Sequence, residues 1–202
     1  MSDKTRTPDP HDGFSRRSFL KGSSAVAAAT AVASSAAEGV AQEDGPKAVT
    51  KALIKLNVNG ADREVTVEGR TTLLEVLRYQ LDLTGAKPVS LDGSSGASTV
   101  LIDGKPVMAS TTLAMAARNK KIQTVESLGG EKPDEVCTAF VTHDAEQCGF
   151  CTPGFVVAVR AFLDKNPKAT EEEIRAGLNG NICRCGTYAN VIDAAVSIAK
   201  GG

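Results

Sequence analysis

The sequence has no strong excess of charge of either sign. Its 23 Lys and Arg residues and 24 Asp and Glu residues leave a formal net charge of −1 over 202 residues. This balance gives no electrostatic reason to expect a nucleic acid partner. The sequence also lacks a phosphate-binding glycine loop, a nucleophile–base triad and any recognisable pair of catalytic carboxylates. The sequence therefore offers no motif for substrate chemistry of these kinds on this chain.

The N-terminal stretch lacks the leucine and isoleucine of a membrane span. Its apolar run over 22–37 is mostly alanine and serine, so no transmembrane segment is expected there. Arg16-Arg17 precedes this run and the small residues Gly39-Val40-Ala41 follow it. The order predicts a twin-arginine signal peptide over 1–42 and export to the periplasm. A solvated linker over 43–49 follows; the alternative for the leader is a disordered tail after a chance arginine pair.

Cysteine is scarce, and four of the five cysteines fall in two short motifs. These motifs are Gln147-Cys148-Gly149-Phe150-Cys151-Thr152-Pro153-Gly154 and Gly180-Asn181-Ile182-Cys183-Arg184-Cys185-Gly186-Thr187-Tyr188. Four converging thiolates can hold Zn²⁺ or a [2Fe–2S] cluster. Reduced buried cysteine pairs, a structural zinc site and a disulfide in an exported protein remain alternatives. The fifth cysteine, Cys137, is expected to be a small core residue.

Local patterns over the first half of the mature chain predict a small mixed sheet with one helix. Alternating apolar residues predict one hairpin over 54–67 and a second over 99–108, with Asn-Gly and Asp-Gly turns. Thr72 with Glu75 predicts a capping box that opens a helix with a leucine stripe. Residues 122–125 suggest a closing strand.

The second half predicts helices after a linker at 129–133. The helices are expected over 136–143, 155–163, 171–178 and 190–199. Thr170 with Glu173 predicts a second capping box. His143 is expected to be a packed or capping histidine rather than a ligand or proton carrier. The result would be a four-helix bundle that holds both cysteine motifs in its loops.

The paired motifs QCGFCTPG and GNICRCGTY resemble the helical [2Fe–2S] domain of the molybdenum hydroxylases. This is the xanthine dehydrogenase, aldehyde oxidoreductase and isoquinoline 1-oxidoreductase family. The stretches LRYQLDLTGAK and STVLIDGKPV are similar to its ferredoxin-like domain, so the resemblance covers about residues 50–200. It implies an α+β fold, with a β-grasp domain over 50–128 followed by a four-helix [2Fe–2S]-binding domain over 134–200.

The resemblance also implies a function and its residues. It assigns Cys148, Cys151, Cys183 and Cys185 as ligands of one [2Fe–2S] cluster, and places Gln147 and Cys185 beside the molybdopterin of a large partner subunit. The chain would carry electrons during oxidation of an aldehyde or aromatic N-heterocycle in the periplasm. The next acceptor would be a FAD subunit or a c-type cytochrome. The rival hypothesis is a non-redox subunit that serves as structural and export escort.

The ferredoxin-like domain departs from the family at its own cluster site. Plant-type ferredoxins ligate iron through C-x4-C-x2-C and a distant cysteine, and serine occupies all four positions here. They are Ser90, Ser95, Ser98 and Ser110. Serine occurs only 14 times in 202 residues, so replacement of former thiols explains the pattern better than chance. Protonated hydroxyls are poor iron ligands, so we expect no cluster and a looser loop there.

The residues around these serines bear on the origin of the replacement. Cysteine-to-serine exchange is a common engineered change. Pro88, Val89 and Leu91 also depart from the charged or polar residues usual in the family, and removal of a cluster by design would leave them alone. Natural loss of the cluster is therefore favoured.

Overall fold

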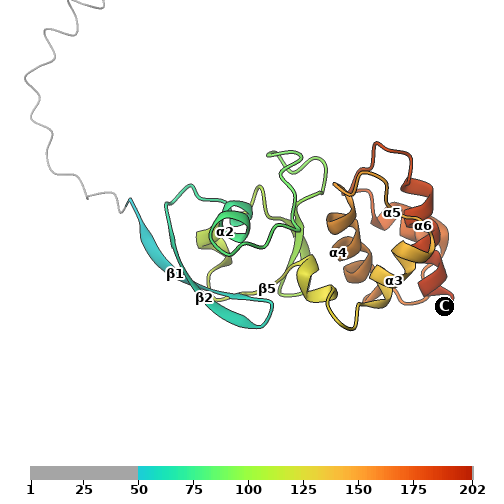
Figure 1. Ribbon diagram of the computed structural model, residues 1–202, viewed down its shortest axis with the longest axis horizontal. Helices are drawn as coiled ribbons and strands as arrows, with labels where there is room; N and C mark the ends of the chain where they lie inside the picture. The colour runs from blue at the N-terminus through green and yellow to red at the C-terminus, as the bar shows by residue number, and fades with distance from the viewer. Residues whose placement is uncertain (1–49, 202) are drawn as a thin grey trace, which may run out of the picture. The chain divides into compact units, whose positions relative to one another are not determined.

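Five short strands form one mixed sheet in the first half of the part of the chain that the structure describes (Figure 1). The structure is a computed structural model that describes residues 50–201. The predicted signal peptide over 1–42 and the linker over 43–49 lie outside the described residues. The strands are β1 (Ala52–Val58), β2 (Ala61–Val67), β3 (Thr99–Ile102), β4 (Lys105–Met108) and β5 (Lys121–Gln123), in the sheet order β2-β1-β5-β3-β4. β1 and β5 are parallel and the other neighbours are antiparallel.

Two tight turns set the register of the sheet. Asn59 and Gly60 have φ of 53° and 81°, and Asp103 and Gly104 have φ of 51° and 73°. Positive φ at both central residues is the conformation that two-residue hairpins require. Both predicted hairpins are therefore confirmed.

The closing strand is shorter than predicted. It ends at Gln123, and Thr124 precedes the 3-10 helix η2 (Val125–Leu128). The Thr124 N–H donates to Asn59 Oδ1 at 2.9 Å, so its backbone leaves the sheet to bond a side chain. The prediction of strand at Thr124 and Val125 was wrong for this reason.

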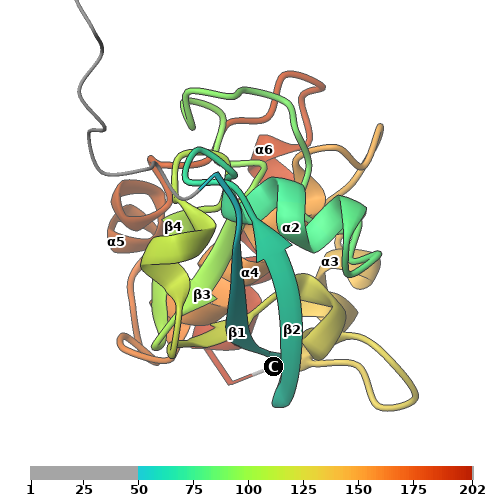
Figure 2. The same cartoon turned by 90° about the vertical axis from the view of Figure 1, so that its left-hand side faces the viewer.

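Helix α2 (Leu73–Tyr79) packs its apolar stripe on one face of the sheet (Figure 2). Thr72 N donates to Glu75 Oε2 at 2.7 Å and Glu75 N donates to Thr72 Oγ1 at 3.2 Å. This is the predicted capping box, which satisfies two backbone donors at the start of the helix. The sheet and its single helix form the β-grasp domain.

Four helices form the second half of the described chain. They are α3 (Glu135–Thr142), α4 (Thr152–Leu163), α5 (Glu171–Gly177) and α6 (Tyr188–Ala199). Thr170 and Glu173 form the second predicted capping box at the start of α5. Phe155 is fully buried and meets the ring of Tyr188 edge-on, with 5.7 Å between ring centroids. Among residues 50–201, no helix has the length and apolar character needed to cross a bilayer.

Strand β3 joins the two domains because both of its faces are buried. Val100 and Ile102 belong to the core under α2, while Leu101 packs against Val157 and Ala161 of α4. Successive strand residues point to opposite faces of a sheet, so four consecutive buried residues require a covering layer on each side. The fold is α+β, with the β-grasp sheet shared between its own helix and the helical domain.

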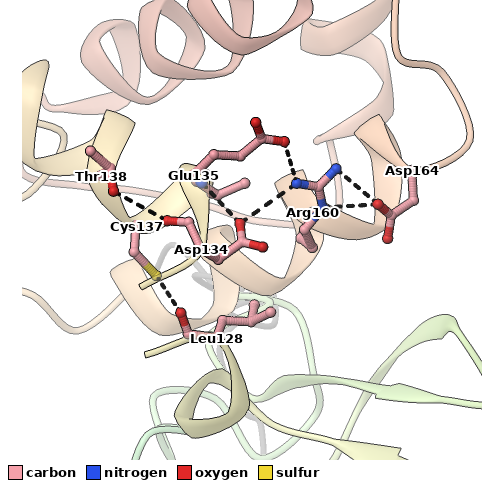
Figure 3. A network of polar contacts seen from close by, with 8 residues as sticks. Leu128, Asp134, Glu135, Cys137, Thr138, Arg160 and Asp164 are labelled. Atoms are coloured by element: carbon pink, nitrogen blue, oxygen red, sulfur yellow. Dashed lines mark hydrogen bonds and ion pairs between the residues drawn. The ribbon is translucent and has the colours of Figure 1, made fainter. Parts of the chain in front are cut away.

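An ion-pair network fixes α4 against the start of α3 (Figure 3). Arg160 lies within 3.6 Å of Asp134, 2.6 Å of Glu135 and 2.8 Å of Asp164. Its side chain is only 17% exposed, which strengthens these pairs relative to fully solvated ones. The network holds in place the two helices whose connecting loop carries Cys148.

Candidate metal centre

The two cysteine motifs lie on loops between the helices of the second domain. Cys148 is on the loop between α3 and α4, and Cys151 is the N-terminal cap residue of α4. Cys183 and Cys185 lie on the loop between α5 and α6. Gly149 and Gly186 turn these loops with φ of 78° and 95°, a conformation that favours glycine.

The outer pair of thiols comes from Cys148 and Cys185, which are both exposed. The Cys185 thiol donates to Cys148 Sγ at 3.3 Å. Hydrogen bonds from the Phe150 N–H and then from Cys185 lower the pKa of Cys148. The pKa of Cys185 is raised, chiefly because it donates to Cys148. The 3.3 Å separation is too long for a disulfide bond.

The inner pair of thiols comes from Cys151 and Cys183, which are half-buried and line the same pocket. Burial, followed by the effect of the neighbouring Cys183 thiol, raises the pKa of Cys151 to about 12. Burial also raises the pKa of Cys183, but hydrogen bonding with the Thr187 hydroxyl and then with the Cys185 backbone outweighs it, so the net pKa is lowered. In each pair, one thiol therefore has a lowered pKa and its partner a raised one.

The donor set is four thiols, two from each motif, around one pocket. Thiolates are ligands of both Zn²⁺ and iron–sulfur clusters. A [2Fe–2S] cluster takes four thiolates spread over two irons, so the four thiols here match the ligand number of one such cluster.

A pocket of about 340 Å³ opens over the four thiols. Val89, Phe150 and Ile182 supply its apolar lining, and each is at least half exposed at its rim. Apolar walls reduce the access of water to the sulfur atoms and lower the local dielectric constant. The pocket is also lined by Ser95, so the β-grasp loop takes part in the site.

The β-grasp loop contacts both cysteine motifs directly. The Ile182 N–H donates to the Ser95 carbonyl at 3.0 Å, and buried Asn181 donates to the Gly96 carbonyl at 2.9 Å. A Cβ at Gly154 would collide with the same Gly96 carbonyl oxygen. Sequence reasoning did not anticipate this junction; the only local signal was the glycine at each close approach.

Comparisons with known proteins agree with this geometry. A family model described as a [2Fe-2S] binding domain matches residues 124–196. The aldehyde oxidoreductase iron-sulfur-binding subunit PaoA of Escherichia coli O157:H7 is 38% identical, over 96% of this chain and 91% of that protein. The chain belongs to the iron–sulfur subunits of the aldehyde oxidoreductase and xanthine dehydrogenase family.

Other members of this family extend the comparison. The nicotinate dehydrogenase small FeS subunit of Eubacterium barkeri is 40% identical, over 75% of this chain and 96% of that protein. The crystal structure of quinoline 2-oxidoreductase from Pseudomonas putida 86 aligns with a TM-score of 0.72 and 40% identity, over 74% of this chain and 93% of that chain. A family model for the twin-arginine signal matches residues 13–33. The predicted export to the periplasm is confirmed.

The four serines that are predicted to replace the ferredoxin cluster ligands form two hydrogen-bonded pairs. Ser90 Oγ lies 2.8 Å from Ser95 Oγ, and Ser98 Oγ donates to Ser110 Oγ at 3.0 Å. Ser98 and Ser110 are buried. Buried hydroxyls that satisfy each other avoid the cost of an unpaired polar group. The predicted looseness of the loop that carries these serines stays a prediction. The two hydrogen bonds connect the four serines in pairs without a metal.

The remaining candidates have separate places in the helical domain. Gln147 is exposed beside Cys148. Cys137 is half-buried against the helical core, and burial followed by the charge of Asp134 raises the pKa of its thiol. His143 caps the C-terminus of α3, and its carbonyl accepts from Asn190 Nδ2 at 2.8 Å. The structure brings neither Cys137 nor His143 into the thiol pairs.

Proposed function

We propose that this chain is the electron-transfer subunit of a periplasmic molybdenum hydroxylase. Cys148, Cys151, Cys183 and Cys185 hold its one [2Fe–2S] cluster in this proposal. The observation that carries it is the convergence of the four thiols, two from each motif, around one pocket, with Cys185 and Cys148 hydrogen-bonded across the motifs. We keep 50–128 and 134–200 as the proposed boundaries of the two domains.

The bound cluster would supply storage for one electron at a time. The chain's own residues set the conditions for this storage. Hydrogen bonding, chiefly from the backbone of Phe150, lowers the pKa of Cys148, which favours its thiolate form. Val89 and Ile182 give the pocket over the sulfurs an apolar lining.

Gln147 and Cys185 are proposed to face the molybdopterin cofactor of the large subunit. Both residues are exposed, and the half-exposed Phe150 and Ile182 line the pocket together with Cys185. An exposed apolar rim around a redox centre is suited to burial in an interface. Electrons would enter the cluster through this face.

The proposed substrate is an aldehyde or an aromatic N-heterocycle, oxidised on the large subunit. The relatives are named for both classes, aldehyde in one case and nicotinate or quinoline in others. The proposed acceptor is a FAD subunit or a c-type cytochrome. With serine at the family's ferredoxin cluster position, the acceptor would take electrons directly from the helical-domain cluster.

One experiment tests the cluster and its count. Iron and acid-labile sulfide in the complex purified from the periplasm should correspond to one [2Fe–2S] cluster per small subunit. Electron paramagnetic resonance after reduction should show a single cluster species, because the serine hydroxyls do not ligate iron. Two distinct signals, or twice the iron, would contradict the proposed loss of the second cluster.

The second candidate function is a structural and export escort without redox activity. The serine replacements favour it, because a chain that has lost one relay centre has lost part of its electron path. Reduction by substrate separates the two functions. A cluster signal that appears when an oxidisable aldehyde or N-heterocycle is added supports electron transfer, whereas an iron-free complex with full activity supports the escort.

A further inference from the structure

Thr187 stands at the N-terminal cap of α6 but does not cap it. Threonine at this position ordinarily accepts a hydrogen bond from a backbone N–H of the first turn. Thr72 and Thr170 do so at the starts of α2 and α5. The Thr187 side chain makes no such bond. Its hydroxyl therefore has another use.

That hydroxyl lies 3.3 Å from Cys183 Sγ. Either group can donate while Cys183 is a thiol. A cysteine that ligates iron is a thiolate, which can only accept, so the Thr187 hydroxyl must then be the donor. Both residues are half-buried, which limits competition from water. Among residues 50–201, no other side-chain hydroxyl is hydrogen-bonded to the four thiols.

We propose that Thr187 is a positioning residue that raises the reduction potential of the cluster through its hydrogen bond to Cys183 Sγ. The inference rests on the proposed ligation by Cys183. A [2Fe–2S] cluster with four thiolates gains one negative charge on one-electron reduction, and part of that charge falls on the cysteine sulfurs. A fixed donor stabilises the more negative state more strongly, so hydrogen bonds to sulfur raise the potential.

The test uses the intact complex purified with Thr187→Val, which removes the hydroxyl at nearly constant volume, and with Thr187→Ser, which keeps it. Midpoint potentials are measured by dithionite titration followed by electron paramagnetic resonance. We expect Thr187→Val to shift the potential to more negative values and Thr187→Ser to stay near the wild type. The thermal unfolding midpoint should change little in both, because no capping bond is lost.

Iron and sulfide analysis of each variant distinguishes a failure of the proposed function from a failure of the proposed role of Thr187. A wild-type complex without iron would refute the proposed function itself. A fully loaded Thr187→Val variant with the wild-type potential would refute only the role of Thr187. If Thr187→Val loses iron, Thr187→Ala takes its place in the titration. Loss of iron from both, with retention in Thr187→Ser, would assign Thr187 to cluster retention and overturn the proposal.

Discussion

At the scale of single residues, two sets of four side chains differ in one atom. The helical loops present sulfur and the β-grasp loop presents oxygen at a ferredoxin spacing. A thiol ionises readily when donors surround it, as for Cys148 and Cys183, whereas a serine hydroxyl stays protonated. The hydroxyls instead bond each other, as in the buried pair of Ser98 and Ser110. Ligand chemistry therefore assigns the metal to the helical domain.

This assignment predicts the effect of the same exchange in the helical domain. Cys151→Ser should lose most of the bound iron and the cluster signal, because one thiolate of the inner pair is replaced by a neutral hydroxyl. Cys137→Ser is the matched control, since its thiol lies outside both pairs and donates only to the Leu128 carbonyl at 3.5 Å. It should retain wild-type iron. Full iron in Cys151→Ser would show that the inner pair is not a ligand pair.

At the scale of elements, helix starts position the site, and they do so with different chemistry. α2 and α5 begin with complete capping boxes, whereas α4 begins at Cys151 with a proline in its first turn and α6 begins at Thr187. The two helices that follow the cysteine loops, α4 and α6, thus begin without a side-chain cap. At the start of α6, the Thr187 hydroxyl is hydrogen-bonded to Cys183 Sγ instead of to a backbone N–H of the helix.

The capping box of α5 has a measurable consequence for stability. Thr170→Ala removes the side chain that accepts from the Glu173 N–H at 3.3 Å, and loss of such a cap costs about 1 kcal/mol. Urea unfolding of the apo chain should show this loss as a lower midpoint with an unchanged slope. Thr138→Ala, on the exposed face of α3, is the control and should cost much less. An equal effect of the two would mean that the cap does not stabilise the fold.

At the scale of the whole molecule, the two domains meet at the candidate site. Leu101 of the sheet packs under α4, and the loop at Ser95 and Gly96 bonds the residues that precede Cys183. The pocket over the four thiols is therefore lined by residues of both domains. Twin-arginine export, which carries folded proteins, fits a site that must be assembled before transport, and a cluster is inserted more readily in the reducing cytoplasm.

Export provides the whole-molecule prediction. Replacing Arg16 and Arg17 with lysine should leave the protein in the cytoplasm, because the arginine pair is the feature that the pathway recognises. Fractionation of cells that express the double variant measures this directly. The cytoplasmic variant should still contain iron, since the cluster residues are untouched. Unchanged periplasmic accumulation of the double variant would refute the role of the pair.

The sequence by itself determined the features that depend on a few neighbouring residues. The two hairpin turns, both capping boxes, the twin-arginine signal and the two cysteine motifs are of this kind, because backbone preference and ligand spacing act over short distances. The sequence by itself did not determine where β5 ends, because the Thr124 N–H donates to Asn59, which lies 65 residues away.

Only the tertiary structure decided which groups meet at the site. The pairing of Cys148 with Cys185 joins residues 37 positions apart, and it depends on how α4 and α6 pack. The junction between Gly96 and Asn181 depends on the contact between domains. Thr187 and Cys183 are only four residues apart in the sequence. A threonine directly before a helix nevertheless predicts a helix cap, not a hydrogen bond to sulfur. Packing places the sulfur where the hydroxyl can reach it, and no local preference encodes that choice.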